Sequence, residues 1–233
     1  MAESPRFIRQ LTGVRFVAAV WVMLFHFRFA FLPLGLPETV FTGFLSAGFL
    51  GVDLFFALSG FILTHTYLNR LGPRVNLRST GNFLWLRLAR VYPVHFVMLN
   101  VMVLAVVAKD TMQPSNQPPR DWLNLSGYVK NLLLVQAWGP TVTPGWNFVA
   151  WSLSMEWLAY LCFPVLVLFL WHFHRRLPIW GLCAAWALPM AALVGYAFFG
   201  NGAWEATVRI ATEFTAGSIT YLIVSRWVFL SPK

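Results

Sequence analysis

Residues 44–68 read FLSAGFLGVDLFFALSGFILTHTYL, and Asp53 is the one carboxylate among them. A helix of about 20 apolar residues crosses the roughly 30 Å hydrocarbon core of a bilayer, so this stretch is expected to span a membrane. Five others are long and apolar enough to do the same, namely residues 11–32, 91–108, 148–171, 179–199 and 206–228. The pattern predicts an all-α fold, a polytopic transmembrane helical bundle of about six spans.

The composition leads to the same fold class. Apolar residues make up 58 % of the 233 residues and charged residues 11 %, whereas soluble domains are about 45–50 % apolar and about 25 % charged. Membrane lipids are therefore the expected surroundings. The net charge of +9 would also suit a nucleic-acid binder, but the basic residues are spread between hydrophobic stretches. No nucleic-acid partner is expected, and the oligomeric state stays open.

The loop charges predict an orientation. Six alternating spans place most basic residues on one side, at Arg6, Arg9, Arg70, Arg74, Arg78, Arg87, Arg90, Arg175, Arg176, Arg226 and Lys233. Lys and Arg stay in the cytoplasm, so both termini are predicted to face inward. Residues 11–32 are too long for a signal-peptide core and are expected to be a retained span. No internal repeat is visible, which favours one membrane domain over residues 1–233.

Ionisable side chains inside a span cost about 2.5–3.5 kcal/mol each on insertion scales, so each needs a reason to be there. Arg15 and His26 lie about three helical turns apart on one face of the first span, with a rise of about 16 Å between them. That spacing suits a ligand with an anionic group near Arg15 and a reactive atom near His26, because imidazole accepts protons near neutral pH. A histidine bonded to another helix and an arginine reaching the head groups fit equally well.

Three carboxylates also fall inside spans, at Asp53, Glu156 and Glu213. Asp53 is predicted to turn inward to a cation or a hydrogen-bond donor, either as a structural clamp or in a substrate role. Glu156 is predicted to share the depth of His26, where a carboxylate would fix the tautomer of the imidazole; pairing with a structural arginine is the alternative. Arg209 and Glu213, one helical turn apart, are expected to form a structural ion pair.

Further polar or short segments lie at the ends of the predicted spans and between them. Arg87 and Arg90 share one helical face at the start of the third span, where they could hold phosphates or anionic lipid head groups. Residues 132–138 are too short to cross and are expected to form an interfacial or re-entrant piece. No ligand cluster accompanies His172 and His174, so no metal site is expected.

Four motifs together resemble the acyltransferase 3 family. They are Arg15-x10-His26, the segment 51–61, Arg87-x-x-Arg90 followed by Val91-Tyr92-Pro93, and Trp151-Ser152-Leu153-Ser154-x-Glu156, in the family's order. This family comprises polytopic membrane O-acyltransferases that modify bacterial polysaccharides, lipopolysaccharide O-antigens and nodulation factors. The resemblance implies transfer of an acyl group, acetyl in the usual case, from acyl-CoA to a sugar hydroxyl of a cell-surface glycan or glycolipid. It also implies location in the bacterial cytoplasmic (inner) membrane.

The resemblance further implies roles for single residues. Arg15, Arg87 and Arg90 would meet the phosphates of acyl-CoA, which is a co-substrate and not a bound cofactor. His26 would deprotonate the acceptor hydroxyl or carry the acyl group transiently, and Glu156 would orient it. The side chains expected to support the site are Asp53, Ser152 and Ser154.

Two departures from the family pattern bear on activity. Trp157 stands where members often carry a second glutamate, and the chain has fewer spans than typical members, so it is expected to lack their C-terminal spans. A catalytically inactive relative is therefore one alternative. A glycolipid transporter or flippase is another, although the inverted repeats of transporters are not visible.

Overall fold

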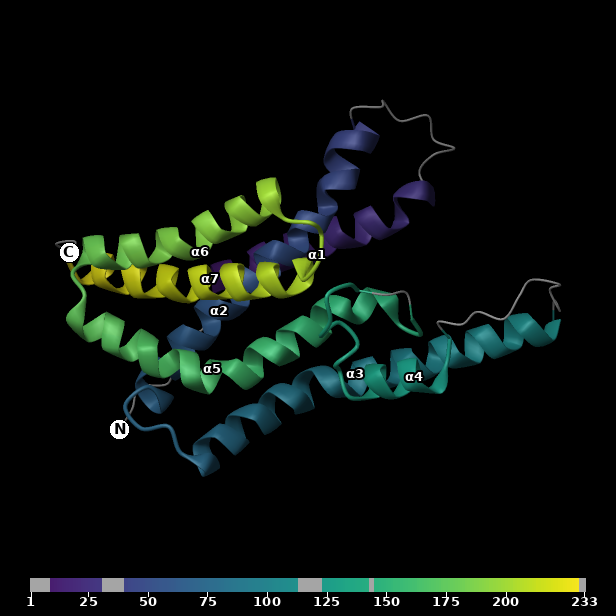
Figure 1. Ribbon diagram of the computed structural model, residues 1–233, viewed down its shortest axis with the longest axis horizontal. Helices are drawn as coiled ribbons and strands as arrows, with labels where there is room; N and C mark the ends of the chain where they lie inside the picture. Colours follow the sequence, from purple (N-terminus) through teal and green to yellow (C-terminus); the bar gives the residue numbers. More distant parts are fainter. Residues whose placement is uncertain (1–8, 31–39, 113–122, 143–144, 231–233) are drawn as a thin grey trace.

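The computed structural model describes residues 9–30, 40–112, 123–142 and 145–230. Within these residues the chain is helical and contains no strand, which confirms the predicted all-α bundle (Figure 1). Its long helices are α1 (Arg9–Phe27), α2 (Leu50–Leu71), α3 (Leu77–Met112), α5 (Trp151–Arg176), α6 (Ile179–Phe199) and α7 (Glu205–Leu230). A π-helical turn (Val40–Leu45) and a 3-10 turn (Ser46–Phe49) lead into α2, and α4 (Leu125–Leu132) follows α3.

Five helical segments are long and apolar enough to cross a membrane, and they make the chain an integral membrane protein: Leu11–Ala30, Gly43–Leu71, Leu77–Met112, Phe148–Arg176 and Ile179–Phe199. The sixth predicted span is α7, which is 26 residues long but more polar. It packs against α2, α5 and α6, and Figure 1 shows it flanked by them. Because neighbouring helices surround it, α7 can bury Thr212, Glu213 and Ser218.

Glycines bring α2 and α7 into close contact. A methyl group at Gly60 would clash with the backbone oxygen of Phe214, and one at Gly217 would clash with that of Ala57. Small residues of this kind let helix backbones approach within a membrane. The close contact of the two helices therefore depends on Gly60 in α2 and Gly217 in α7.

The third span differs from its prediction of residues 91–108. Helix α3 begins at Leu77 and has 36 residues, a length of about 54 Å. Hydropathy falls where Arg87 and Arg90 appear, but the helix continues through both arginines and through Pro93, which lies inside it. The two arginines therefore lie in the body of α3 and face its neighbours.

Residues 132–138 fold against α5. Leu134 adopts a left-handed conformation (φ 58°), and its carbonyl oxygen accepts a hydrogen bond from Ser154 Oγ at 2.8 Å. The backbone N–H of Ala137 donates to the same hydroxyl at 3.3 Å, and the indole of Trp138 donates to the Ser154 carbonyl at 3.1 Å. Ser154 thus anchors this segment, consistent with the predicted supporting role.

Candidate active site

A cavity of about 220 Å³ lies between α1, α2, α3 and α5. We call it the arginine cavity, and its polar lining residues are Arg15, Ser59, Arg87, Arg90, Glu156 and Tyr160. Each helix contributes at least one of them, because these polar positions all lie on faces that point into the bundle. The fold therefore brings together the three arginines that the sequence analysis had selected from two separate spans.

Positive charge in the arginine cavity is not balanced. Glu156 Oε1 accepts hydrogen bonds from Ser59 Oγ and from the Tyr160 hydroxyl, each 2.5 Å long. Within the described ranges, ion pairs join Arg209 to Asp53 and to Glu205, so Glu156 forms none with the three arginines. Three guanidinium groups thus share a cavity with one carboxylate that bonds to hydroxyls.

Two of these arginines also have a hydrogen-bond donor without a partner among the described residues. The Nε atoms of Arg15 and Arg87 are buried and have no hydrogen-bond partner among the described residues. Arg87 donates through Nη2 to the Tyr67 hydroxyl at 3.2 Å. Arginine forks bind phosphate and carboxylate groups with charge-assisted hydrogen bonds, so this cavity has the charge and the free donors that an anion requires.

A second cavity, which we call the histidine cavity, adjoins the first. It measures about 650 Å³, lies between α1, α3 and the start of α5, and has mostly apolar walls that include Val22, Met23, Val94, Met98 and Leu153. His26 lines it, and Arg90 and Val91 line both cavities. Arg15 and His26 therefore line two neighbouring cavities along α1, Arg15 the arginine cavity and His26 the histidine cavity.

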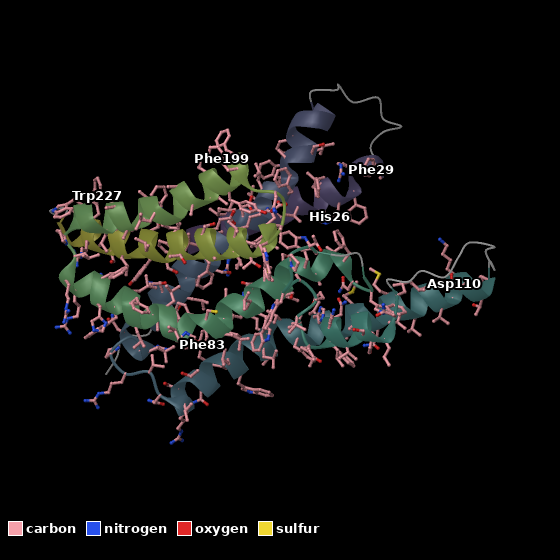
Figure 2. All side chains as sticks on the ribbon, in the orientation of Figure 1. His26, Phe29, Phe83, Asp110, Phe199 and Trp227 are labelled. Atoms are coloured by element: carbon pink, nitrogen blue, oxygen red, sulfur yellow. The ribbon has the colours of Figure 1, made fainter. Side chains whose placement is uncertain are left out.

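His26 lies on the last turn of α1 (Figure 2). Its Nδ1 donates to the backbone oxygen of Val22 at 2.8 Å. In the neutral ring this hydrogen bond leaves the lone pair on Nε2, the atom that can accept a proton. The Val22 carbonyl therefore fixes the tautomer of His26, which is the role predicted for Glu156.

The predicted contact between His26 and Glu156 is absent from the described structure. Glu156 lines the arginine cavity, and Ser152, one turn earlier on α5, lines the histidine cavity instead. Helix α5 begins only at Trp151, after the 3-10 turn Phe148–Ala150. The residues at the level of His26 therefore belong to this turn and the first turn of α5, and Glu156 lies deeper.

Asp53 lies outside both cavities and turns to a cation, as predicted. Its Oδ1 accepts hydrogen bonds from Arg209 Nε at 2.8 Å and from Arg209 Nη2. The guanidinium also lies 5.3 Å from the ring centre of Trp151. The prediction of an Arg209–Glu213 salt bridge is wrong. The close approach of α2 and α7 brings Asp53 to Arg209 instead.

Sequence reasoning missed two polar residues of these cavities. Tyr160 follows Glu156 by one helical turn, a spacing that places both on one face and could have identified it. The second is His95, which is buried in the middle of α3 on the wall of the histidine cavity.

Helices of membrane-spanning length that enclose a cavity lined by charged residues define a polytopic membrane protein with an internal site. The chain matches the acyltransferase 3 family, described as an acyltransferase domain, over residues 8–230, and it belongs to that family. No solved structure matches it.

Named relatives support the same assignment. The chain is 33 % identical to acyltransferase MdmB of Streptomyces mycarofaciens over 192 residues, which are 78 % of this chain and 44 % of that protein. It is 38 % identical to Protein 2 in picA locus of Rhizobium radiobacter over 104 residues, 44 % of this chain and 48 % of the relative. O-acetyltransferase OatA of Staphylococcus aureus is 28 % identical over 176 residues, 72 % of this chain and 26 % of the relative. The chain thus spans less than half the length of these relatives.

Proposed function

We propose that the protein transfers an acyl group, acetyl in the simplest case, from acyl-CoA to a sugar hydroxyl of a cell-surface glycan, as an O-acyltransferase of the bacterial cytoplasmic membrane. The observation that carries this proposal is the junction of the two cavities at Arg90. Unbalanced guanidinium groups line the cavity on one side of this junction, and the imidazole of His26 lines the cavity on the other side. The names of two relatives, an acyltransferase and an O-acetyltransferase, support the same chemistry.

The proposed donor fits the order of groups along α1. The phosphates of acyl-CoA bind at Arg15, Arg87 and Arg90, and the pantetheine arm follows the apolar walls toward His26. The rise of about 16 Å between Arg15 and His26 suits an arm that separates the phosphates from the thioester. Glu156 balances part of the positive charge before the donor binds, in place of its predicted role beside His26.

The transfer step then uses His26 as a general base. Nε2 takes the proton of the acceptor hydroxyl while the hydroxyl oxygen attacks the thioester carbonyl carbon. The new C–O bond forms, the C–S bond breaks, and coenzyme A leaves as a thiolate that receives the proton from the imidazolium. A general base of this kind contributes about 10²–10⁴-fold to the rate.

Replacement of His26 tests this proposal. In membranes supplied with radiolabelled acetyl-CoA, His26→Ala is expected to abolish transfer to glycan while membrane insertion is retained. His172 is a matched control, because its Nδ1 makes the same hydrogen bond to the backbone one turn earlier, at 2.8 Å, outside both cavities. Transfer by His26→Ala at the rate of His172→Ala would refute the catalytic role.

The donor site is tested with the arginine pair. The double variant Arg87→Ala, Arg90→Ala is expected to weaken acetyl-CoA binding more than acceptor use. Arg175 and Arg176 at the end of α5 provide a matched basic pair outside both cavities, and their double alanine variant is expected to bind acetyl-CoA normally. Equal losses in the two double variants would indicate lipid anchoring instead of a donor site.

A further inference from the structure

The histidine cavity contains a second imidazole, at His95 on α3. The side chain is 3 % exposed, and its Nε2 lies 2.8 Å from the backbone oxygen of Asn131 on α4. A carbonyl oxygen only accepts hydrogen bonds, so Nε2 carries a hydrogen and donates it. In the neutral imidazole the lone pair of His95 therefore lies on Nδ1.

Nδ1 of His95 has no hydrogen-bond partner among the described residues. Two other buried acceptors near α4 share this property, Oδ1 of Asn131 and Oε1 of Gln136. Asn131 is the residue that holds His95, and the amide nitrogen of Gln136 donates to Ala150 on the wall of the histidine cavity at 3.1 Å. A buried polar group without a partner is unfavourable, and of these three acceptors the one on His95 belongs to a residue that lines the histidine cavity.

The hydrogen-bonding atoms that lack a partner are donors in one cavity and an acceptor in the other. Arg15 and Arg87 carry unpartnered donors in the arginine cavity, which favours an anion, whereas the unpartnered atom of His95 on the wall of the histidine cavity is an acceptor. A molecule rich in hydroxyl groups supplies donors and carries no charge that Arg90 would repel. The acyl donor binds at the arginines, so the part of the histidine cavity beside His95 is left for the acceptor.

We propose that His95 Nδ1 accepts a hydrogen bond from a hydroxyl of the glycan acceptor, beside the hydroxyl that His26 deprotonates. This inference rests on the proposed function and adds an acceptor-binding residue to it. By holding one hydroxyl, His95 determines which of the neighbouring hydroxyls faces His26. Loss of this contact therefore changes both the amount of acylation and its position on the sugar.

Two substitutions separate this role from the anchoring of α4. His95→Gln places an amide nitrogen near the former Nε2, so it retains the bond to Asn131 and removes the acceptor at Nδ1. His95→Asn places an oxygen near the former Nδ1 and removes the bond to Asn131. Each variant of the full-length protein is expressed in a deletion strain. The O-acyl content and position on the extracted surface polysaccharide are read by NMR, and acetyl-CoA affinity and thermal stability are measured on purified protein.

His95→Gln is expected to lower O-acyl content about tenfold, the equivalent of one hydrogen bond, and to shift the acylated position, with acetyl-CoA affinity and thermal stability unchanged. His95→Asn is expected to retain acylation and lose thermal stability. Acylation that falls only in step with stability would reduce His95 to an anchor of α4, and normal acylation in His95→Gln would mean that water satisfies Nδ1. A wild-type chain that restores no O-acyl group would overturn the proposed function itself.

Discussion

Two clusters of charged side chains lie inside the bundle, and they are built differently. Between α2 and α7, Asp53 holds Arg209 with two hydrogen bonds, and the side chains are 23 % and 14 % exposed. In the arginine cavity, three guanidinium groups share one carboxylate, which bonds to Ser59 and Tyr160. The first cluster satisfies its own charges, whereas the second leaves charge and donors unused.

The contrast separates structural from ligand-binding charge. A half-buried ion pair depends on both members, because removing one leaves the other uncompensated. Unbalanced charge beside a cavity depends instead on a counter-ion that arrives with the ligand. Substitutions in the first cluster should therefore affect stability, and substitutions in the second should affect binding.

The largest expected effect is the loss of Arg209. Arg209→Ala leaves Asp53, and the Glu213 carboxyl that hydrogen bonds to it, without their cation. Breaking a buried pair in this way costs about 3–5 kcal/mol, to be measured by denaturant unfolding of the protein in detergent. The double variant Asp53→Ala, Arg209→Ala should lose less than the sum of the single losses. A change below about 1 kcal/mol in Arg209→Ala would contradict the structural role.

Arg15→Ala should have the opposite profile. It removes one of three like charges, so the empty protein should be no less stable, while the loss of charge-assisted hydrogen bonds of about 1.5–3 kcal/mol should weaken acetyl-CoA binding about 10- to 150-fold. Isothermal titration with acetyl-CoA measures this change. Arg28, just after the end of α1, donates to the Phe25 carbonyl outside both cavities, and Arg28→Ala should bind normally. A fall in stability with unchanged binding would place Arg15 in the structural class.

Glu156→Gln should have a smaller effect than Arg15→Ala, and it should strengthen acetyl-CoA binding instead of weakening it. The amide removes the one negative charge from the arginine cavity, so anionic phosphates should bind more tightly, by about 1 kcal/mol or fivefold. The same titration measures it, at low and at high salt. Glu205, whose side chain is 60 % exposed beside Arg209, provides the control variant Glu205→Gln with unchanged affinity. Weaker binding would show that Glu156 holds the arginines in place.

The contrast also explains which features the sequence could predict. Membrane spans follow from hydropathy, because a bilayer excludes polar surface, and the common face of Arg15 and His26 follows from helical periodicity. The partner of Asp53 does not, because it depends on Gly60 and Gly217 packing two helices that are far apart in sequence. The level of Glu156 depends on the residue at which α5 begins, and a shift of one turn moves it from one cavity to the other. His95 was overlooked because burial and a missing partner are properties of the folded chain.

The smallest effect concerns the residue that orients Arg87. Tyr67→Phe removes the hydroxyl that accepts from Arg87 and leaves the ring, which is 4.9 Å from the ring centre of Phe83; Figure 2 shows Phe83 between α3 and α5. Because the aromatic packing is kept, stability should stay within about 0.5 kcal/mol of the wild type. Arg87 loses an orienting partner worth about 0.5–1 kcal/mol, so acetyl-CoA should bind about two- to fivefold more weakly. The same substitution in the variant Arg87→Ala should change nothing further, since the hydroxyl acts only through that guanidinium. An additional loss in the double variant would mean that Tyr67 contacts the donor directly.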